Sequence, residues 1–301
     1  MKGIVIKSTG SWYLVRLIDG DIVKSRLKGK FRNKFIDSTN PIVVGDKVVL
    51  EKDENDFMIS ELLDRKNIIV RKSVNLSKRN HLIASNIDQA ILFVTINYPK
   101  TSTTFIDRFL VSANAFGVDV IIVINKIDLY NQNEIISVDK LETLYSKIGY
   151  KCLSISILND SLDILKDLLS NKTTLVSGHS GVGKSTLINK LIPNLNIKTK
   201  EVSSLYNLGK HTTTFSELYE LNLKSNIIDT PGIKGFGLTE IKRNEISKYF
   251  NEFLNIQSKC KFHNCLHINE PDCMIRQEIS KGNIAKSRYK SYLNMLSEED
   301  R

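Results

Sequence analysis

The alternation of hydrophobic and polar positions changes character along the chain. Up to about residue 66, apolar residues come in short β-rich runs that turn residues separate. Several short strands without a convincing helix predict a small barrel, for which an OB-fold is the first choice. The runs are Ile4–Ile6, Trp12–Leu17, Val43–Leu50 and, more weakly, Phe57–Leu63.

The middle of the chain alternates strand-like apolar runs with helix-like segments. Continuous apolar strands are typical of a parallel sheet covered on both faces, so this part predicts an α/β layer. The polar and basic residues 67–85 before it are expected to form a linker. The expected strands are Ala90–Ile96, Val118–Ile124, Cys152–Ile155 and Thr173–Ser177. The expected helices are Phe105–Phe116, Glu134–Ile148, Leu162–Leu169 and Ser185–Leu191.

The C-terminal part has helical segments at Glu245–Phe253 and Ala285–Leu296, on either side of a group of cysteines. The whole pattern predicts a multi-domain α/β protein. We expect an N-terminal barrel over residues 1–67, a central α/β sheet over 68–236 and a mostly helical domain that carries the cysteines over 237–301.

A glycine-rich stretch lies between the last expected strand and helix of the α/β layer. It has the spacing G-x-x-x-x-G-K-[ST] of a phosphate-binding loop, whose N–H groups converge on phosphates at the positive end of the following helix. We expect Lys184 to reach the β- and γ-phosphates and Ser185 to bind Mg²⁺. A chance glycine turn is disfavoured, because strand, loop and helix follow in the required order. The residues are Gly178, His179, Ser180, Gly181, Val182, Gly183, Lys184 and Ser185, followed by Thr186.

A second motif follows the strand Val118–Ile124 and indicates the base. Asn125-Lys126-Ile127-Asp128 matches N-K-x-D, the guanine-reading motif. The carboxylate of Asp128 can accept both guanine donors, N1–H and N2–H₂, whereas adenine would leave it unpaired. We expect Asn125 to bond the N7/O6 side and the stem of Lys126 to lie along the ring. Ser154 and Ser156, after the next strand, form either the loop that touches the guanine edge or a plain strand end.

Two later segments complete the GTPase motifs. Lys210-His211-Thr212-Thr213-Thr214 is a candidate first switch, in which Thr213 would join the Mg²⁺ shell when the γ-phosphate is present. Asp229-Thr230-Pro231-Gly232 matches D-x-x-G: Asp229 would hold Mg²⁺ through water, and the Gly232 N–H would meet the γ-phosphate. Ile233 follows, not the Gln that many GTPases use, so His211 is the candidate for orienting the attacking water. Because the guanine motif precedes the phosphate loop, the domain reads as circularly permuted.

Three of the four cysteines lie close together near the C-terminus. The spacing C-x₄-C-x-H-x₅-C offers three thiolates and one imidazole, the closed tetrahedral set of a structural Zn²⁺. No catalysis is assigned to it, since no coordination position is open. His263 is a rival to the histidine ligand. The set is Cys260, Cys265, His267 and Cys273.

The chain carries 43 Lys and Arg against 33 Asp and Glu, a net charge of +10 that favours a polyanionic partner. Six basic residues occupy every second position from Lys24 to Lys34, which in an extended strand forms a stripe suited to a phosphate backbone, with Phe31 available to stack. A solvated edge strand is the alternative. A second candidate for nucleic-acid contact, or else a solvated helix face, consists of Arg276, Lys281, Lys286, Arg288 and Lys290, with Tyr289 and Tyr292 between them.

No apolar run approaches the about 20 residues that a membrane helix needs. The segment from Met1 to Val15 lacks a secretory hydrophobic region, so we expect the cytoplasm and no membrane partner. Two other interpretations remain open. One is an RNA-binding assembly protein whose GTP site acts only as a switch, and the other is a GTPase at a membrane.

Together these motifs resemble one family, the circularly permuted, ribosome small-subunit-dependent GTPases (RsgA, also called YjeQ). The resemblance covers the barrel, the guanine motif before the phosphate loop, both switch motifs and the cysteine–histidine set. It implies a cytoplasmic, monomeric factor that binds GTP and GDP with Mg²⁺ and carries one structural Zn²⁺. It also implies that the factor binds the maturing 30S subunit and its 16S rRNA late in assembly, and that the subunit stimulates hydrolysis of GTP to GDP and phosphate.

Overall fold

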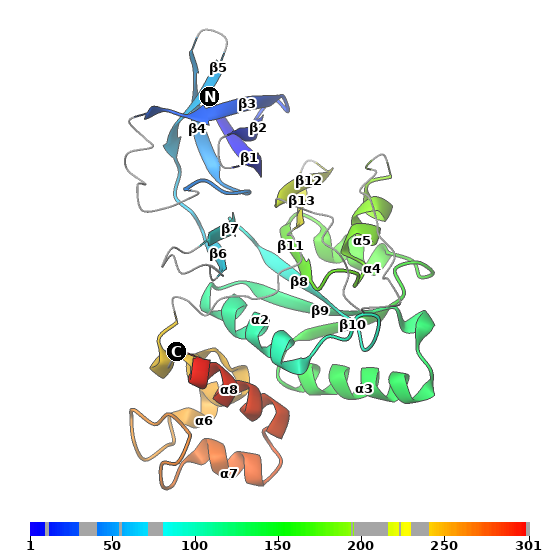
Figure 1. Ribbon diagram of the computed structural model, residues 1–301, viewed down its shortest axis with the longest axis vertical. Helices are drawn as coiled ribbons and strands as arrows, with labels where there is room; N and C mark the ends of the chain where they lie inside the picture. Colours follow the sequence, from blue (N-terminus) through cyan, green and yellow to red (C-terminus); the bar gives the residue numbers. More distant parts are fainter. Residues whose placement is uncertain are drawn as a thin grey trace.

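The computed structural model describes residues 1–9, 12–29, 41–53, 56–71, 81–193, 195, 216–222, 224–229 and 241–298. In Figure 1 the N-terminal barrel lies at one end, the α/β region in the middle and the C-terminal helices at the other end. This arrangement confirms the predicted fold class.

The N-terminal barrel consists of β1 (Lys2–Ser8), β2 (Tyr13–Leu17), β3 (Ile22–Leu27), β4 (Lys47–Asp53) and β5 (Asp56–Leu62). The strand order β1-β2-β3-β5-β4 is closed by pairing of β1 with β4. Alternate apolar side chains point inward and form one core. The expected strand Val43–Leu50 begins only at Lys47, because the backbone turns at Gly45 (φ +92°). Strand β3, within the basic stretch, was not predicted separately.

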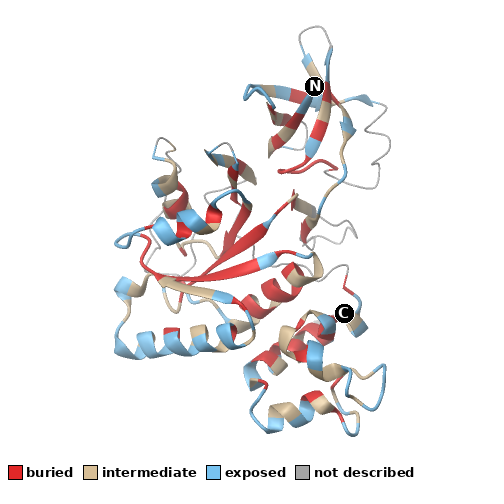
Figure 2. Cartoon of the chain, turned by 180° about the vertical axis from the view of Figure 1, so that it is seen from behind, coloured by how far each residue is buried: buried red, intermediate tan, exposed pale blue. Residues whose placement is uncertain are grey.

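The central sheet contains the parallel strands β10 (Lys151–Ile155), β9 (Asp119–Asn125), β8 (Gln89–Val94), β11 (Thr173–Gly178) and β13 (Ser225–Asp229), in this order. Its antiparallel neighbour is β12 (Glu217–Asn222), which follows the first-switch segment in the chain. Every residue of β8 is buried, as the continuous apolar run predicted. The buried central strands are visible in Figure 2.

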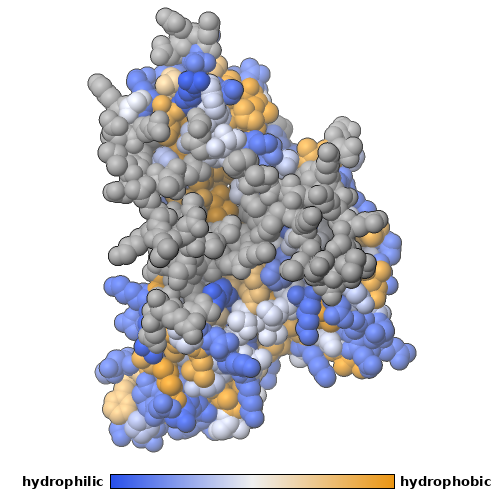
Figure 3. Space-filling view, viewed as in Figure 1, coloured by the Kyte–Doolittle hydropathy of each residue, from blue (hydrophilic) through white to orange (hydrophobic). Residues whose placement is uncertain are grey.

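Helices cover both faces of this sheet, which makes three layers. On one face α2 (Thr103–Ala115) and α3 (Gln132–Lys147) pack against one hydrophobic cluster. On the other face α4 (Asp163–Leu169) and α5 (Lys184–Leu191) pack against a second cluster. The carboxyl ends of the parallel strands therefore meet at one edge, where ligands bind in α/β folds. In the view of Figure 3, hydrophilic residues predominate over the outer surface of α3.

The segment between the barrel and the sheet is not a plain linker. Residues 67–85 contain the antiparallel strands β6 (Ile68–Arg71) and β7 (His81–Ser85). The barrel strand β1 also pairs with β12, with Lys7 opposite Glu217, so that the barrel sheet continues into the central sheet.

The C-terminal module consists of the 3₁₀ helix η3 (Arg243–Tyr249) and the helices α6 (Asn251–Gln257), α7 (Met274–Ser280) and α8 (Lys286–Glu298). The expected helix Glu245–Phe253 is divided at Phe250, where the backbone is extended (ψ 110°). Helix α7 was not predicted. Within the described residues, no helix is both long enough and apolar enough to cross a membrane.

Candidate functional site

The glycine-rich loop connects the end of β11 to the start of α5, as predicted. Gly178 and Gly183 both have positive φ, +143° and +110°. A Cβ on Gly178 would lie 2.4 Å from the carbonyl oxygen of Phe93, and one on Gly183 would lie 2.3 Å from Nδ2 of Asn125. Only glycine fits at both positions. Ser180, Gly181 and the buried Val182 lie in the loop, and Ser185 and Thr186 belong to the first turn of α5.

Lys184 is the first residue of α5 and is buried. Its ammonium group donates hydrogen bonds to the carbonyl oxygens of Gly178 and His179, both at 2.8 Å. Burial lowers the pKa of Lys184 to about 8, and the charge of Asp229 partly opposes that shift. Asp229 is buried at the end of β13, the strand beside β11. The structure thus brings together the two residues assigned to the phosphates and to Mg²⁺.

Asn125, the first residue of the guanine motif, connects three loops. Its side-chain amide donates to the carbonyl oxygen of Val182 at 2.8 Å, and its side-chain oxygen accepts from the N–H of Ile157 at 3.0 Å. Val182 belongs to the phosphate loop and Ile157 to the loop after β10. The motif that precedes the phosphate loop by more than fifty residues in the sequence is therefore in contact with it.

The remaining guanine-motif residues also lie where the parallel strands of the central sheet end. Lys126 has a positive φ of 69°, and its ammonium group donates to the carbonyl oxygen of Tyr98 at 2.6 Å. Burial lowers the pKa of Lys126, and Asp128 opposes that shift. Asp128 is exposed in a short 3₁₀ turn, η2 (Ile127–Leu129), where its carboxylate is accessible to a base.

The two serines expected in the guanine-edge loop differ. Ser154 lies inside β10, and its hydroxyl donates to Glu142 of α3 at 2.7 Å. For Ser154 the alternative of a plain strand end is the correct one, because β10 ends at Ile155, as the expected strand did. Ser156 does lie in the loop and is buried, and its N–H donates to Asp160 at 2.7 Å.

The structure adds a neighbour of the phosphate loop that the sequence did not indicate. The ring of Phe105, near the start of α2, lies 4.0 Å from the imidazole of His179, centroid to centroid. Nothing in the sequence predicts this contact, because Phe105 is an ordinary apolar residue near the start of a helix. The switch residues His211, Thr213 and Gly232 lie outside the described residues, as does Phe31.

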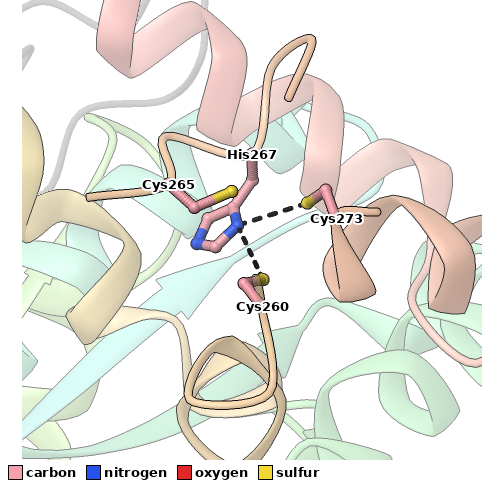
Figure 4. A group of neighbouring side chains, drawn as sticks. All are labelled: Cys260, Cys265, His267 and Cys273. Carbon is pink, nitrogen blue, oxygen red and sulfur yellow. Dashed lines mark hydrogen bonds between the residues drawn. The ribbon is translucent and has the colours of Figure 1, made fainter. Parts of the chain in front are cut away.

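The cysteine–histidine set comes together as a cluster (Figure 4). The four potential ligand atoms of Cys260, Cys265, His267 and Cys273 lie within 4.8 Å of one another. Nδ1 of His267 is 3.6 Å from Sγ of Cys260 and 3.4 Å from Sγ of Cys273. Tetrahedral Zn²⁺ places neighbouring N and S ligands about 3.6 Å apart, so the residues fit this ion. His263 is exposed and is not part of the cluster.

Neighbouring side chains hold the loop that carries this cluster. The hydroxyl of Tyr289 donates to the carbonyl oxygen of His267, and that of Tyr292 donates to the carbonyl oxygen of Leu266, both at 2.7 Å. Glu270 accepts from the N–H of Leu266 at 2.7 Å. Burial raises the pKa of Cys265 to about 12 and lowers the pKa of His267. Burial thus favours the neutral ligands, and a bound cation would favour the thiolates.

The two basic surfaces expected from the sequence have different outcomes. Lys24 and Arg26 of β3 and Lys28 just after it are exposed, as predicted, whereas Lys30, Arg32 and Lys34 of the same stripe lie outside the described residues. Lys24 and Arg26 both lie over the ring of Trp12, at 3.9 Å and 3.7 Å from its centroid. Near the C-terminus the prediction fails for Arg288, which is fully buried. Tyr292 is buried as well, and the aromatic rings there support the cysteine–histidine loop.

Comparisons with known proteins agree with this geometry. The family model described as RsgA GTPase matches residues 62–239, and the model of the RsgA N-terminal domain matches residues 2–57. The chain is similar to the small ribosomal subunit biogenesis GTPase RsgA of Bacteroides fragilis, with 51% identity over 302 residues, 100% of this chain and 97% of that protein. The protein of the same name from Flavobacterium psychrophilum is 51% identical over 305 residues, 100% of this chain and 94% of that protein.

Two solved structures resemble the whole chain. The crystal structure of YjeQ from Thermotoga maritima has a TM-score of 0.78 and 33% identity, and the match covers 99% of this chain and 98% of that one. The structure of YloQ, described as a circularly permuted GTPase, has a TM-score of 0.73 and 28% identity, covering 99% and 94%.

Proposed function

The chain belongs to the RsgA family of small ribosomal subunit biogenesis GTPases, and from that premise we propose where the nucleotide binds and what the flanking regions contact. GTP lies at the edge where β9, β10, β11 and β13 end. The observation that carries this proposal is the double hydrogen bond of Asn125. Because its amide connects the guanine motif to the phosphate loop, one nucleotide can contact both.

In this proposal each motif acts on one part of GTP. The carboxylate of Asp128 accepts from the guanine N1–H and N2–H₂ groups, and Lys184 binds the phosphates. Ser185, Asp229 through a water and, once the γ-phosphate is bound, Thr213 would hold Mg²⁺, which would supply charge neutralisation at the phosphates. The protein positions water and neutralises the charge that develops on the transferred phosphoryl group. A Zn²⁺ at the C-terminal cluster would supply structural stability only.

The base assignment can be tested by changing the specificity. In Asp128→Asn an N–H donor replaces a carboxylate oxygen, which suits the C2 carbonyl of xanthine and not the C2 amine of guanine. We expect GTP affinity to fall about 100-fold, because one hydrogen bond to the carboxylate is lost and the other loses its charge, and XTP affinity to rise. Titration with fluorescent nucleotides measures both. Asp119→Asn, at the opposite end of β9, is the control and should bind GTP normally.

The lysine assignment predicts a pH dependence. Only the protonated ammonium attracts phosphate, and burial lowers its pKa to about 8. GTP affinity should therefore stay constant below pH 8 and fall towards tenfold per pH unit above it. Calorimetry in two buffers of different ionisation enthalpy should show proton uptake on binding at pH 8.5 and not at pH 6.5. Affinity that stays flat to pH 9.5 would mean that the pKa of Lys184 is not lowered, whereas unchanged GTP affinity in Lys184→Ala would contradict its role at the phosphates.

We further propose that the chain binds the maturing 30S subunit and 16S rRNA in the cytoplasm, as a monomer, and assists late assembly. The exposed cations beside Trp12 support contact with RNA, because they combine charge with a stacking surface. Binding of the subunit would stimulate hydrolysis. We place the domain boundaries at about residues 67 and 236, so that the barrel precedes the GTPase domain and the C-terminal module follows it.

Co-sedimentation with 30S subunits under GDP and under a non-hydrolysable GTP analogue tests the partner. Binding should weaken steeply with salt, and Trp12→Ala combined with Lys24→Ala should weaken it further. Lys140→Ala, an exposed lysine on α3, is the control. Phosphate release measured with and without subunits tests stimulation. His211→Ala should lose the stimulated rate and keep its GTP affinity; full stimulated turnover would exclude His211 as the water-orienting group.

A further inference from the structure

Helix α2 is buried on two sides and belongs to two hydrophobic cores. Ile106, Phe109 and Leu110 pack into the cluster on the central sheet. Val111 belongs instead to the cluster of the C-terminal module. In Figure 2 most of α2 is drawn as buried. A helix that covers a sheet normally has one solvated face, whereas here the second face is covered by the C-terminal helices.

The first turn of α2 touches the phosphate loop. The tilted rings of Phe105 and His179 lie 4.0 Å apart, with an interplanar angle of 31°. The backbone N–H of Phe105 donates to the side chain of Ser102, which caps the helix. This ring is therefore held at a fixed helix start, and its contact restrains the first residue after Gly178.

The position of α2 is fixed from the other side by a buried ion cluster. Nη1 of Arg288 lies 2.6 Å from Oδ1 of Asp107, and the same guanidinium makes two bonds to Glu252 at 2.7 Å and 3.0 Å. The hydroxyl of Tyr145 donates to Oδ1 of Asp107 at 2.7 Å. At the far end of the helix, Asn114 donates to the carbonyl oxygen of Tyr249 at 2.9 Å.

Asp107 and Phe105 are two positions apart, so their side chains leave the helix on different sides. We propose that α2 is a positioning element for the phosphate loop, which the C-terminal module holds in place through the Asp107–Arg288–Glu252 cluster. The inference rests on the proposed nucleotide site. It means that the C-terminal module influences how tightly GDP and GTP are retained, through the contact between Phe105 and His179.

The first test concerns the ring contact. Phe105→Leu keeps apolar bulk against the sheet cluster and removes the ring that faces His179. We expect GDP to dissociate roughly 2- to 12-fold faster, the range that corresponds to the energy of an aromatic pair. Phe105→Tyr keeps the ring and should retain the original rate. Phe116→Leu is the matched control, because Phe116 packs on the same cluster beyond the other end of α2.

The second test concerns transmission from the C-terminal module. Asp107→Asn weakens the ion cluster without changing its size, and we expect GDP release to accelerate roughly 2- to 10-fold. In the Phe105→Leu background the same substitution should add little, because both act through one contact. Asp139→Asn, on the exposed face of α3, controls for the lost charge. If Asp107→Asn does not fold, Asn114→Ala loosens the same junction more gently.

The outcomes separate this inference from the proposed function. An unmodified protein that does not bind GTP would refute the nucleotide site itself. Normal GTP binding together with unchanged release rates in Asp107→Asn or Asn114→Ala would refute only the coupling through α2. Full additivity of Asp107→Asn and Phe105→Leu would refute it as well.

Discussion

The barrel and the C-terminal module are held to the GTPase region by different kinds of contact. The C-terminal module is attached through desolvated side chains: Arg288 and Asp107 have no exposed side-chain surface. The barrel is attached through main-chain bonds, where β1 pairs with β12 and the N–H of Ser85 donates to the carbonyl oxygen of Val44 at 3.0 Å, together with side-chain bonds from Arg16 to Glu220 and Asn226 and from Ser85 to Asp46. A buried ion cluster depends on every member, whereas main-chain pairing depends on no single side chain. Single side-chain substitutions should therefore destabilise the attachment of the C-terminal module more than the attachment of the barrel.

Removal of the metal should have the largest effect and should be confined to the C-terminal side. Structural Zn²⁺ contributes about 10–16 kcal/mol of apparent folding free energy in small domains, so chelation or Cys273→Ser should unfold that module. Trp12, the only tryptophan, lies in the barrel and reports on the other side. The helical signal in circular dichroism should decrease, while the midpoint of barrel unfolding, followed by Trp12 fluorescence, should not change. Cys152→Ser, in β10, is the control, and a simultaneous loss of both signals would contradict independent junctions.

Arg288→Met should have the next largest effect. It leaves the carboxylates of Asp107 and Glu252 buried without their cation, which typically costs about 3–5 kcal/mol. Urea unfolding followed by circular dichroism should show this loss, with the Trp12 transition much less affected. Arg276→Met, on the exposed surface of α7, should stay within about 0.5 kcal/mol of the original protein. A loss below 1 kcal/mol in Arg288→Met would mean that the cluster is not the main attachment.

Sequence patterns predicted the parts of the fold that depend on local burial. The strands β8 and β9 contain continuous apolar runs, and a covered parallel strand needs that composition. β12 was missed because its polar, alternating sequence ELYELN belongs to a strand at the edge of the central sheet. The phosphate loop and the cysteine–histidine cluster were predicted because their chemistry requires fixed residue types at short spacing.

Long-range partners were beyond the sequence. Arg288 stands among surface lysines on its helix, and its partner Asp107 is 181 residues away. Only the topology brings α2 and α8 together, so a basic cluster was the natural interpretation. Asn125 is similar: the motif indicated its place at the site, but its bonds to Val182 and Ile157 follow from the packing of adjacent strand ends.

The main-chain junction of the barrel has one vulnerable position, Gly45. Its φ is +92°, and a Cβ there would lie 2.2 Å from the carbonyl oxygen of Ser85. Gly45→Ala should cost about 2–4 kcal/mol, the sum of a left-handed residue and a steric overlap, and should shift the Trp12 transition. Gly20→Ala has a similar φ of +96° with nothing within 4 Å, so it should cost only the conformational part, about 1–2 kcal/mol. If Gly45→Ala and Gly20→Ala lost the same free energy of unfolding, the close packing of Gly45 against Ser85 would not stabilise the attachment of the barrel.

The smallest effect is expected from Lys7–Glu217, which has the more exposed cation of the two ion pairs that join the barrel to β12, the other being Arg16–Glu220. Nζ of Lys7 lies 3.0 Å from Glu217, but the two side chains remain 34% and 30% exposed. A double-mutant cycle with Lys7→Met and Glu217→Gln should give a coupling of about 0.2–1 kcal/mol that largely disappears in 1 M salt. The cycle with Asp107→Asn and Arg288→Met should give a larger coupling that salt barely changes, because water and ions do not reach that pair. If the Lys7–Glu217 coupling exceeded 2 kcal/mol and resisted salt, side chains would hold both ends of the molecule, and the contrast between the two junctions would be lost.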